Sequence, residues 1–266
     1  MEKRKYIYFY YSKSDDLEEK INPLFEHIEK SGFEIVDDPK EANIIVSVGG
    51  DGEFLQAVRH TNFKQDSLYV GITKENEAGL YCDFHLGHYV DMIHAMKNEE
   101  LEVRRFPVIE VTINGESSFY CLNEAAIRSA IIKTIVMDVY IDDTHFERFR
   151  GDGLIVATPT GSTGYNKSTH GAVVDPKLAC IQVSELASLN NNRYRTLGSS
   201  FLLNQDRTLR LEVLQDGNDY PIIGLDNEAY SIRNIHSITI RLSDKRIKTV
   251  KLKNNSYWDR VKRTFL

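Results

Sequence analysis

The segment Gly49-Gly50-Asp51-Gly52 places a single carboxylate among three glycines, directly after the apolar run Ile44–Val48. Glycines let backbone N–H groups approach a phosphate closely, and a helix predicted from about Glu53 to His60 would direct its positive end at the same point. A carboxylate there is unfavourable unless it binds a metal or takes a proton from an attacking hydroxyl. The pattern indicates a phosphoryl-transfer site, with an ordinary strand–turn–helix junction as the alternative.

Two further polar segments follow apolar runs. The loop from Thr158 to Ser168 carries four hydroxyls, on Thr158, Thr160, Ser162 and Thr163, that could bind phosphate or ribose oxygens, and Tyr165 could stack on a base. A Ser/Thr turn that caps a short helix is the alternative for this loop. Asn123-Glu124, after an expected strand at 119–122, offers donor and acceptor groups suited to a ribose or a magnesium-bound water. An N-cap with an acidic first turn explains this pair as well.

Composition narrows the class of protein. The 266 residues, 41% hydrophobic and 27% charged, are typical of a soluble globular chain with one large domain or two small ones. A net charge of -6 argues against nucleic-acid binding, and we expect the densest basic run, 245–253, to be a solvated edge strand. Three widely spaced cysteines indicate reduced thiols. No signal peptide or long apolar run is visible, so we expect a cytoplasmic protein without membrane contact.

The first hundred residues alternate between strand and helix patterns. Strands are expected at 6–11, 33–36, 44–48 and 68–72, and helices after Ser14 and over 88–98. Pro23 predicts a kinked or divided first helix, and Val90 and Ile93, with Met92 or Met96, are expected to pack in the second. This alternation predicts a parallel sheet with helices on its faces, in which ligands bind beyond the carboxyl ends of the strands.

After about residue 101 the sequence pattern becomes typical of β-strands. Alternating apolar residues predict strands near 109–113, 135–141, 209–213 and 238–242, and Asn114-Gly115 predicts a two-residue hairpin turn. These short strands favour stacked sheets. The tail from Tyr257 to Phe265 is expected to be a helix with Trp258, Val261 and Phe265 on its buried face.

The motifs together resemble the NAD kinase family, in particular its bacterial ATP-dependent members. The order is Gly49-Gly50-Asp51-Gly52, then Asn123-Glu124, then Gly151-Asp152-Gly153 with the Thr158–Tyr165 loop. Diacylglycerol and sphingosine kinases share only the first motif. The resemblance implies an α/β plus β fold: a Rossmann-like parallel domain at 1–101, joined by a returning C-terminal helix at about 254–266, and a β-rich stacked-sheet domain at 102–253.

The resemblance also implies the reaction and the roles of residues. The expected activity is phosphorylation, with ATP as donor and Mg²⁺ as metal, of the 2′-hydroxyl of the adenosine ribose of NAD, giving NADP. Asp51 would be the catalytic base, framed by Gly50 and Gly52. Asn123 and Glu124 would hold NAD, and Asp152 with nearby Arg150 would bind its nicotinamide end. The remaining implied contacts to NAD are Thr163, Gly164, Tyr165, Asn166, Lys167, Ser168, Ala187 and Asn227. A homodimer or homotetramer would complete each site with a neighbouring subunit, and no residue is assigned as a metal ligand.

Three departures from the family pattern bear on alternatives. Glu53 stands where the family has threonine, Ala78-Gly79-Leu80-Tyr81 replaces a Leu-Gly-Phe segment, and Gly164 replaces alanine. One alternative is a lipid kinase of the diacylglycerol or sphingosine type, against which the polar 158–168 loop argues. Another is a non-catalytic dinucleotide-binding regulator, against which the retained Asp51 argues.

Overall fold

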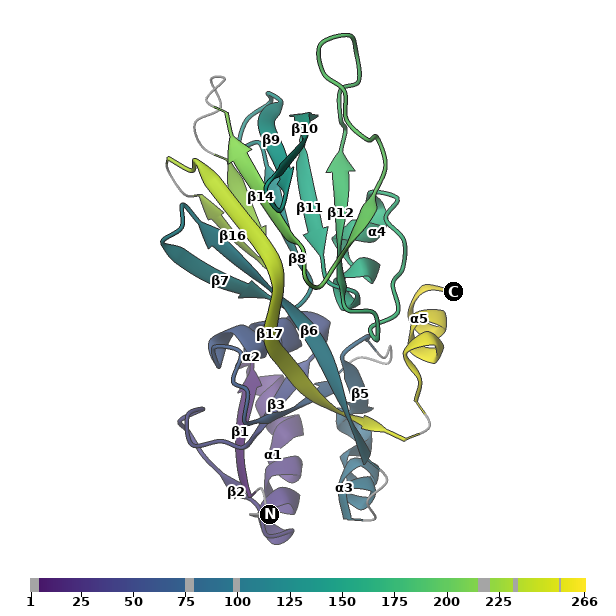
Figure 1. Cartoon of the computed structure of the whole chain (residues 1–266). Coiled ribbons are helices and arrows are strands. Elements are labelled where there is room, and N and C mark those ends of the chain that lie inside the picture. The colour runs from purple at the N-terminus through teal and green to yellow at the C-terminus, as the bar shows by residue number, and fades with distance from the viewer. Residues whose placement is uncertain (1–4, 75–78, 98–100, 215–220, 232–233, 254) are drawn as a thin grey trace. The chain divides into compact units, whose positions relative to one another are not determined.

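The computed structural model describes residues 5–74, 79–97, 101–214, 221–231, 234–253 and 255–266 (Figure 1). The chain divides into two compact units, one formed by Met1–Phe106 with Arg246–Leu266 and the other by Pro107–Lys245. The divisions fall inside two long strands, β6 (Leu101–Ile113) and β17 (Ser237–Leu252). The domain boundaries expected from the sequence, after 101 and before 254, stay a prediction.

The first unit contains a parallel sheet flanked by helices. Its strands lie in the order β2-β1-β3-β4, with β5 and the last part of β17 also paired to β4. The strands are β1 (Tyr6–Tyr11), β2 (Glu34–Ile35), β3 (Ile44–Gly49), β4 (Leu68–Thr73) and β5 (Cys82–His85). The helices are α1 (Asp15–Lys30), α2 (Asp51–His60), the short η1 (Leu86–His88) and α3 (Tyr89–Lys97). The predicted alternation of strand and helix in a parallel α/β unit is confirmed.

Two local expectations in this unit need correction. Pro23 lies inside α1, which runs as one helix of 16 residues, so the expected division is wrong and a kink stays a prediction. The apolar face around Leu17, Ile21, Leu24 and Ile28 is buried along the whole helix and outweighs the lost hydrogen bond. In α3, Met92 and Ile93 are buried but Val90 is 44% exposed. The side chain of Met96, and residues Ala78 and Asn98, lie outside the described residues.

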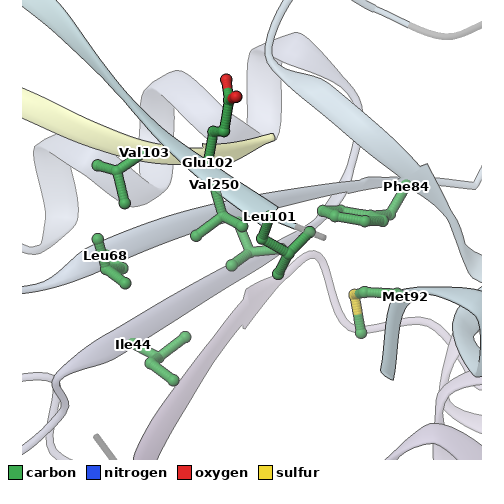
Figure 2. A pocket seen from close by; sticks show the side chains of 9 residues that line it. Ile44, Leu68, Phe84, Met92, Leu101, Glu102, Val103 and Val250 are labelled. Carbon is green, nitrogen blue, oxygen red and sulfur yellow. The ribbon is translucent and has the colours of Figure 1, made fainter. Parts of the chain in front are cut away.

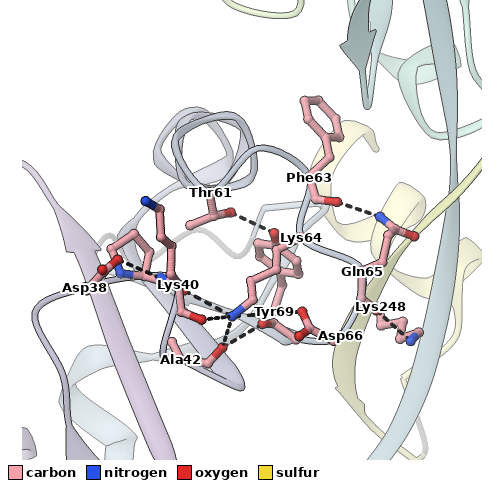
Figure 3. A network of polar contacts seen from close by, with 12 residues as sticks. Asp38, Lys40, Ala42, Thr61, Phe63, Lys64, Gln65, Asp66, Tyr69 and Lys248 are labelled. Atoms are coloured by element: carbon pink, nitrogen blue, oxygen red, sulfur yellow. Dashed lines mark hydrogen bonds and ion pairs between the residues drawn. The ribbon is translucent and has the colours of Figure 1, made fainter.

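Lys64 fixes the connection that leads into β3. Its ammonium group donates to the carbonyls of Pro39 at 3.2 Å and of Lys40 and Ala42, both at 2.6 Å (Figure 3). A lysine ammonium has three donors, so all three are used on the backbone of one turn. The turn before Ile44 is therefore held in place. Ile44 begins β3, and the glycine turn follows at the other end of this strand.

The last helix of the first unit is α5 (Tyr257–Phe265). It begins with a capping box in which the Ser256 hydroxyl accepts from the Asp259 N–H at 3.0 Å while the Asp259 carboxylate accepts from the Ser256 N–H at 3.4 Å. The buried residues are Tyr257 and Arg260, whereas Trp258 is 49% and Phe265 37% exposed. The expected buried face is therefore wrong, because a buried arginine replaces an apolar stripe.

The second unit consists of two antiparallel sheets. One sheet has the order β13-β12-β11-β8-β15-β16, and the other contains β10-β9-β14 with β6, β7 and β17. The strands are β7 (Ser117–Cys121), β8 (Glu124–Arg128), β9 (Ile135–Ile141), β10 (Thr144–Gly151), β11 (Gly153–Ala157), β12 (Cys180–Leu186), β13 (Phe201–Asn204), β14 (Thr208–Val213), β15 (Ile222–Leu225) and β16 (Glu228–Ser231). Two short helices, η2 (Thr160–Thr163) and α4 (Tyr165–Ser168), follow β11.

One hydrophobic core joins the facing sheets of this unit. Ile127 and Leu154 contribute from one sheet, and Met137, Leu211 and Ile240 from the other, all with at most 1% exposure. Side chains that alternate along each strand direct one apolar set inward, which is why the two-residue period predicts stacked sheets. The α/β plus β fold class is confirmed.

Two expectations about strand connections need correction. The β6–β7 hairpin pairs Ile113 with Ser117 and so has three connecting residues rather than two, although Asn114 and Gly115 adopt the positive φ of 52° and 73° that the turn requires. The basic run 245–253 lies mostly on β17, which pairs with β4 at Thr249 and also with β6, and is not an edge strand. Lys251 is instead neutralised by Glu102 at 2.7 Å.

Candidate functional site

Asp51 is the first residue of α2, at the carboxyl end of β3. Its carboxylate accepts hydrogen bonds from the N–H of Leu80 at 2.6 Å and of Tyr81 at 2.8 Å, and the N–H of Cys82 also contributes. A side chain at position 79 would collide with the carboxylate, so this close approach requires Gly79. The segment 79–81, in which the sequence departs from the family pattern, thus surrounds the carboxylate of the proposed base.

Opposing effects set the basicity of Asp51. Burial raises the pKa of its carboxyl group, while the three backbone hydrogen bonds and the positive charge of Arg260 act to lower that pKa. A carboxylate has about four lone-pair positions, so the N–H donors of Leu80 and Tyr81 leave capacity for a substrate hydroxyl. This geometry suits a general base.

Glu53 lies in the same turn and is half-buried. Its carboxylate folds back toward the glycines, so that a Cβ added to Gly50 would stand 3.6 Å from Glu53 Oε2 and one added to Gly49 would collide with the side chain. The substitution of threonine by glutamate therefore adds a negative charge to the surface of the glycine turn.

In the second unit, Asn123 lies between β7 and β8, and Glu124 begins β8. The carboxylate of Asp226 accepts from the N–H groups of Leu122 at 3.0 Å, Asn123 at 2.7 Å and Glu124 at 3.2 Å. Glu124 is 8% exposed, and its Oε2 atom has no hydrogen-bond partner among the described residues. Burial and, secondly, the charge of Asp226 raise the pKa of Glu124 to about 8. Glu124 is thus a buried carboxylic acid with hydrogen-bonding capacity left for a ligand.

The four expected hydroxyls of the 158–168 loop bond to the backbone. Thr158 donates to the Leu122 carbonyl at 2.6 Å, and Ser162 to the Pro159 carbonyl at 2.5 Å. Thr160 and Thr163 likewise donate to backbone carbonyls, and all four side chains are buried. These bonds fit the alternative of a Ser/Thr turn, and contact of the hydroxyls with a ligand stays a prediction. Thr158 and Thr160 tie the loop to the strand end that carries Asn123 and Glu124, and Ser162 and Thr163 bond within the loop.

The structure brings Glu124, Tyr165 and Asn227 together around one cavity of about 270 Å³. Arg128 lines this cavity too, with its guanidinium 5.8 Å from the Tyr165 ring centre, and it also lines an adjacent cavity of about 370 Å³ that contains Asp152. The sequence reasoning missed Arg128. The signal was present, because the two-residue period of β8 places Glu124, Ala126 and Arg128 on one face. Asp226 was also missed.

Other expected contacts have their own partners. Arg150 donates from Nε to the Thr134 hydroxyl at 3.0 Å and from Nη1 to the Tyr194 hydroxyl at 2.7 Å. Asn166 is fully buried and accepts from the Ser184 hydroxyl at 2.7 Å. Both side chains are therefore held by neighbouring residues.

The remaining expected residues lie at the surface. Gly164, Lys167 and Ser168 are exposed around the start and end of α4. Ala187 is also exposed, directly after β12, with a positive φ of 44°. Neither of the two cavities described above, around Glu124 and around Asp152, is lined by any of these four residues.

An apolar cavity in the first unit is a feature of the core. It has a volume of about 160 Å³ and is lined by Ile44, Leu68, Val70, Phe84, Met92, Leu101, Glu102, Val103 and Val250 (Figure 2). The only carboxylate among these residues, that of Glu102, points away from the apolar side chains and pairs with Lys251. The cavity offers no group for chemistry.

The described residues contain neither a metal-binding cluster nor a membrane-spanning helix. No group of three or more His, Cys, Asp or Glu side chains is placed to hold a metal ion in the part of the chain that the structure describes. Within the same residues, no helix is both long and apolar enough to cross a membrane.

An α/β unit with a cradled carboxylate in its glycine turn, and a β unit with a polar cavity, are features of a nucleotide-binding kinase. Residues 122–252 match the ATP-NAD kinase C-terminal domain family. The chain is 61% identical over 265 residues to NAD kinase 2 of Bacillus subtilis, covering 100% of this chain and 99% of that protein. It is 62% identical over 263 residues to NAD kinase 2 of Geobacillus kaustophilus, covering 99% and 98%. The chain belongs to the NAD kinase family.

Solved structures agree on the fold. Yeast NADH kinase complexed with NADH matches with a TM-score of 0.82 at 16% identity, over 97% of this chain and 86% of that one. An NAD kinase from Archaeoglobus fulgidus in complex with ATP matches with a TM-score of 0.75 at 25% identity, over 97% and 99%. The resemblance expected from the ordered motifs is confirmed.

Proposed function

We propose that this NAD kinase transfers the terminal phosphoryl group of ATP to the 2′-hydroxyl of the adenosine ribose of NAD, giving NADP. The observation that carries the proposal is Asp51, a half-buried carboxylate at the carboxyl edge of a parallel sheet whose backbone donors Leu80 and Tyr81 leave room for a substrate hydroxyl. The comparisons support this reading and give no support to a lipid kinase or a silent regulator.

Asp51 takes the proton of the ribose hydroxyl as that oxygen attacks phosphorus. Asp51 stands at the N-terminus of α2, so the positive end of the helix dipole faces the proposed position of the phosphates. Gly50 and Gly52 flank Asp51 at this point. In the second unit, Asn123 and Glu124 bind hydroxyls of NAD, and Tyr165 and Asn227 form the wall of the same cavity. Arg150, Asp152, Thr163, Gly164, Asn166, Lys167, Ser168 and Ala187 complete the proposed surroundings of NAD.

Mg²⁺ enters the proposal with the nucleotide. The described residues offer no three-ligand group, and Mg²⁺ commonly keeps several waters and binds largely through substrate phosphates. No residue of this chain is therefore assigned to the ion. When bound, it would neutralise charge on the triphosphate, and the protein supplies the base, the backbone donors and the NAD site.

We further propose a cytoplasmic homodimer or homotetramer in which a neighbouring subunit completes each site near Asp152. Ile131 and Ile132 are 57% and 110% exposed, and both line the cavity that contains Asp152. Exposed apolar side chains beside a polar site are typical of surfaces that a partner covers.

The test of the reaction is NADP formation by the purified chain from NAD, ATP and Mg²⁺, compared with Asp51→Asn. The amide preserves size but removes the base, so kcat should fall by about 10²–10⁴-fold with NAD affinity retained. Diacylglycerol and sphingosine serve as competing acceptors. Phosphorylation of lipid without NADP formation would refute the function, and an Asp51→Asn variant with normal kcat would refute the base.

A further inference from the structure

Arg260 of α5 is a buried charge without an evident purpose in folding alone. Its side chain is 1% exposed and pairs with the 2% exposed Asp83 at 2.6 Å. A second guanidinium nitrogen donates to the carbonyl of Leu80. Burying an ion pair is costly and often contributes little to stability compared with apolar residues of the same volume. The pair therefore needs an explanation beyond packing.

The segment that Arg260 grips is the same segment that cradles Asp51. The Leu80 carbonyl accepts from Arg260, while the Leu80 and Tyr81 N–H groups donate to the two oxygens of Asp51 at 2.6 and 2.8 Å. The guanidinium thus lies at one side of this short segment and the carboxylate at the other. Peptide groups bound at both their carbonyl and N–H ends are polarised, which strengthens the hydrogen bonds to the carboxylate.

The charged surroundings make Arg260 the main cationic influence on Asp51. Of the described groups, Arg260 is the one whose charge acts directly to lower the pKa of Asp51. The other titratable groups at or facing Cys82 and Asp83 come from four elements. They are Asp83 and the buried Cys82 themselves on β5, Arg104 on β6, Arg263 on α5 and Glu53 on α2. Burial raises the pKa of the Cys82 thiol, so it stays neutral, and Asp83 offsets part of the charge of Arg260.

We propose that Arg260 is a positioning residue for the kinase reaction, which holds the Leu80–Asp83 segment against the carboxylate of Asp51. The proposal rests on the role of Asp51 as base argued above. Arg260 acts through Leu80 and through space, and it does not touch the substrate. The C-terminal helix thereby becomes part of the catalytic apparatus.

The test uses the pH profile of kcat for Arg260→Gln, Asp83→Asn and Arg260→Lys in the full chain. Loss of the guanidinium should move the acidic limb about one pH unit upward, because an opposite charge shifts a carboxyl pKa by about one to three units. At pH values below the limb, kcat should fall about tenfold, with the KM for NAD within about twofold of normal. Asp83→Asn frees the charge of Arg260 and should move the limb in the opposite direction, and Arg260→Lys should keep the limb near its normal place.

A second readout does not depend on catalysis. The amide resonances of Leu80 and Tyr81 should titrate with Asp51, and the same variants should shift that titration by the same amounts. Trp258→Ala, next to the buried residues of α5 but 49% exposed, is the matched control and should change neither profile.

The outcomes separate this inference from the function on which it rests. Limbs that stay in place in Arg260→Gln and Asp83→Asn, or that move in the same direction in both, overturn the positioning role. Amide titrations that shift as expected while the kcat profile does not would keep the coupling of Arg260 to Asp51 and refute Asp51 as the base. Thermal unfolding of each variant identifies one that is merely misfolded, and Arg260→Lys then supplies the decisive comparison.

Discussion

Asp51 and Glu53 begin the same helix two residues apart but meet different surroundings. Asp51 accepts hydrogen bonds from backbone N–H groups, while the half-buried Glu53 folds toward Gly49 and Gly50. A single turn thus separates a carboxylate suited to proton transfer from one that only adds charge where phosphates are proposed to bind.

Replacing Glu53 tests this added charge. Glu53→Thr should lower the KM for ATP by up to about fivefold, the size of one exposed charge interaction, without changing the KM for NAD. Steady-state kinetics at fixed free Mg²⁺ measures both constants. Glu53→Gln, which keeps the length and removes the charge, is the matched control. If both variants bind ATP as the original chain does, Glu53 has no influence on the donor.

Glu124 predicts a pH-dependent stability. Its pKa of about 8 in the folded chain lies above the ordinary 4.5, so the folded state binds the extra proton between these values. The contribution of protonated Glu124 to the free energy of unfolding is therefore complete below pH 4.5 and is lost as pH rises toward 8. Glu124→Gln should remove this loss, gaining on the original chain by roughly 1.4 kcal/mol per pH unit in that range.

Urea unfolding of both proteins at several pH values between 5 and 8 measures the difference. Glu116→Gln, at an exposed position of the β6–β7 turn, controls for removal of a carboxylate as such. A constant difference between Glu124→Gln and the original chain would show that Glu124 is ionised in the folded state.

At the scale of elements, two serines occupy the N-cap position of a helix, but only one of them makes a side-chain capping hydrogen bond. Ser256 caps α5 through its hydroxyl, whereas Ser14 precedes α1 without a side-chain capping bond. Ser256→Ala should therefore cost about 1 kcal/mol and Ser14→Ala only a few tenths. Hydrogen exchange should quicken within α5 in the first variant. Equal losses of stability in both variants would contradict the assigned cap.

The elements themselves were largely predictable, because apolar periodicity reports burial of one face. The buried face of α5 was not, since Arg260 is buried through an ion pair with a residue far away in sequence. Asp51 and the Asn123-Glu124 pair could be found from local pattern. The backbone donors to Asp51 and the carboxylate of Asp226 could not, because they join positions 29 and about a hundred residues apart. Such contacts leave no periodic trace.

At the scale of the whole molecule, the proposed oligomer can be tested by complementation. Asp51→Asn and Asp152→Ala should each be poorly active alone. If neighbouring subunits complete each site, exchange between them should restore up to about a quarter to a half of the activity, because some pairings unite two intact halves. Sedimentation measures assembly and subunit exchange. A fully active monomer, or no recovery after proven exchange, would contradict a shared site.

The division of the chain also imposes an order on synthesis. The first unit needs residues 246–266, which the ribosome makes only after the whole of 107–245. Because compact units fold as they become complete during translation, the β unit can fold while the α/β unit still lacks its last strand segment and α5. Leu80 then meets Arg260 last of all. A nascent chain would acquire its proposed NAD-binding surface before its proposed base is set, so the growing polypeptide would form the proposed dinucleotide site before it could phosphorylate NAD.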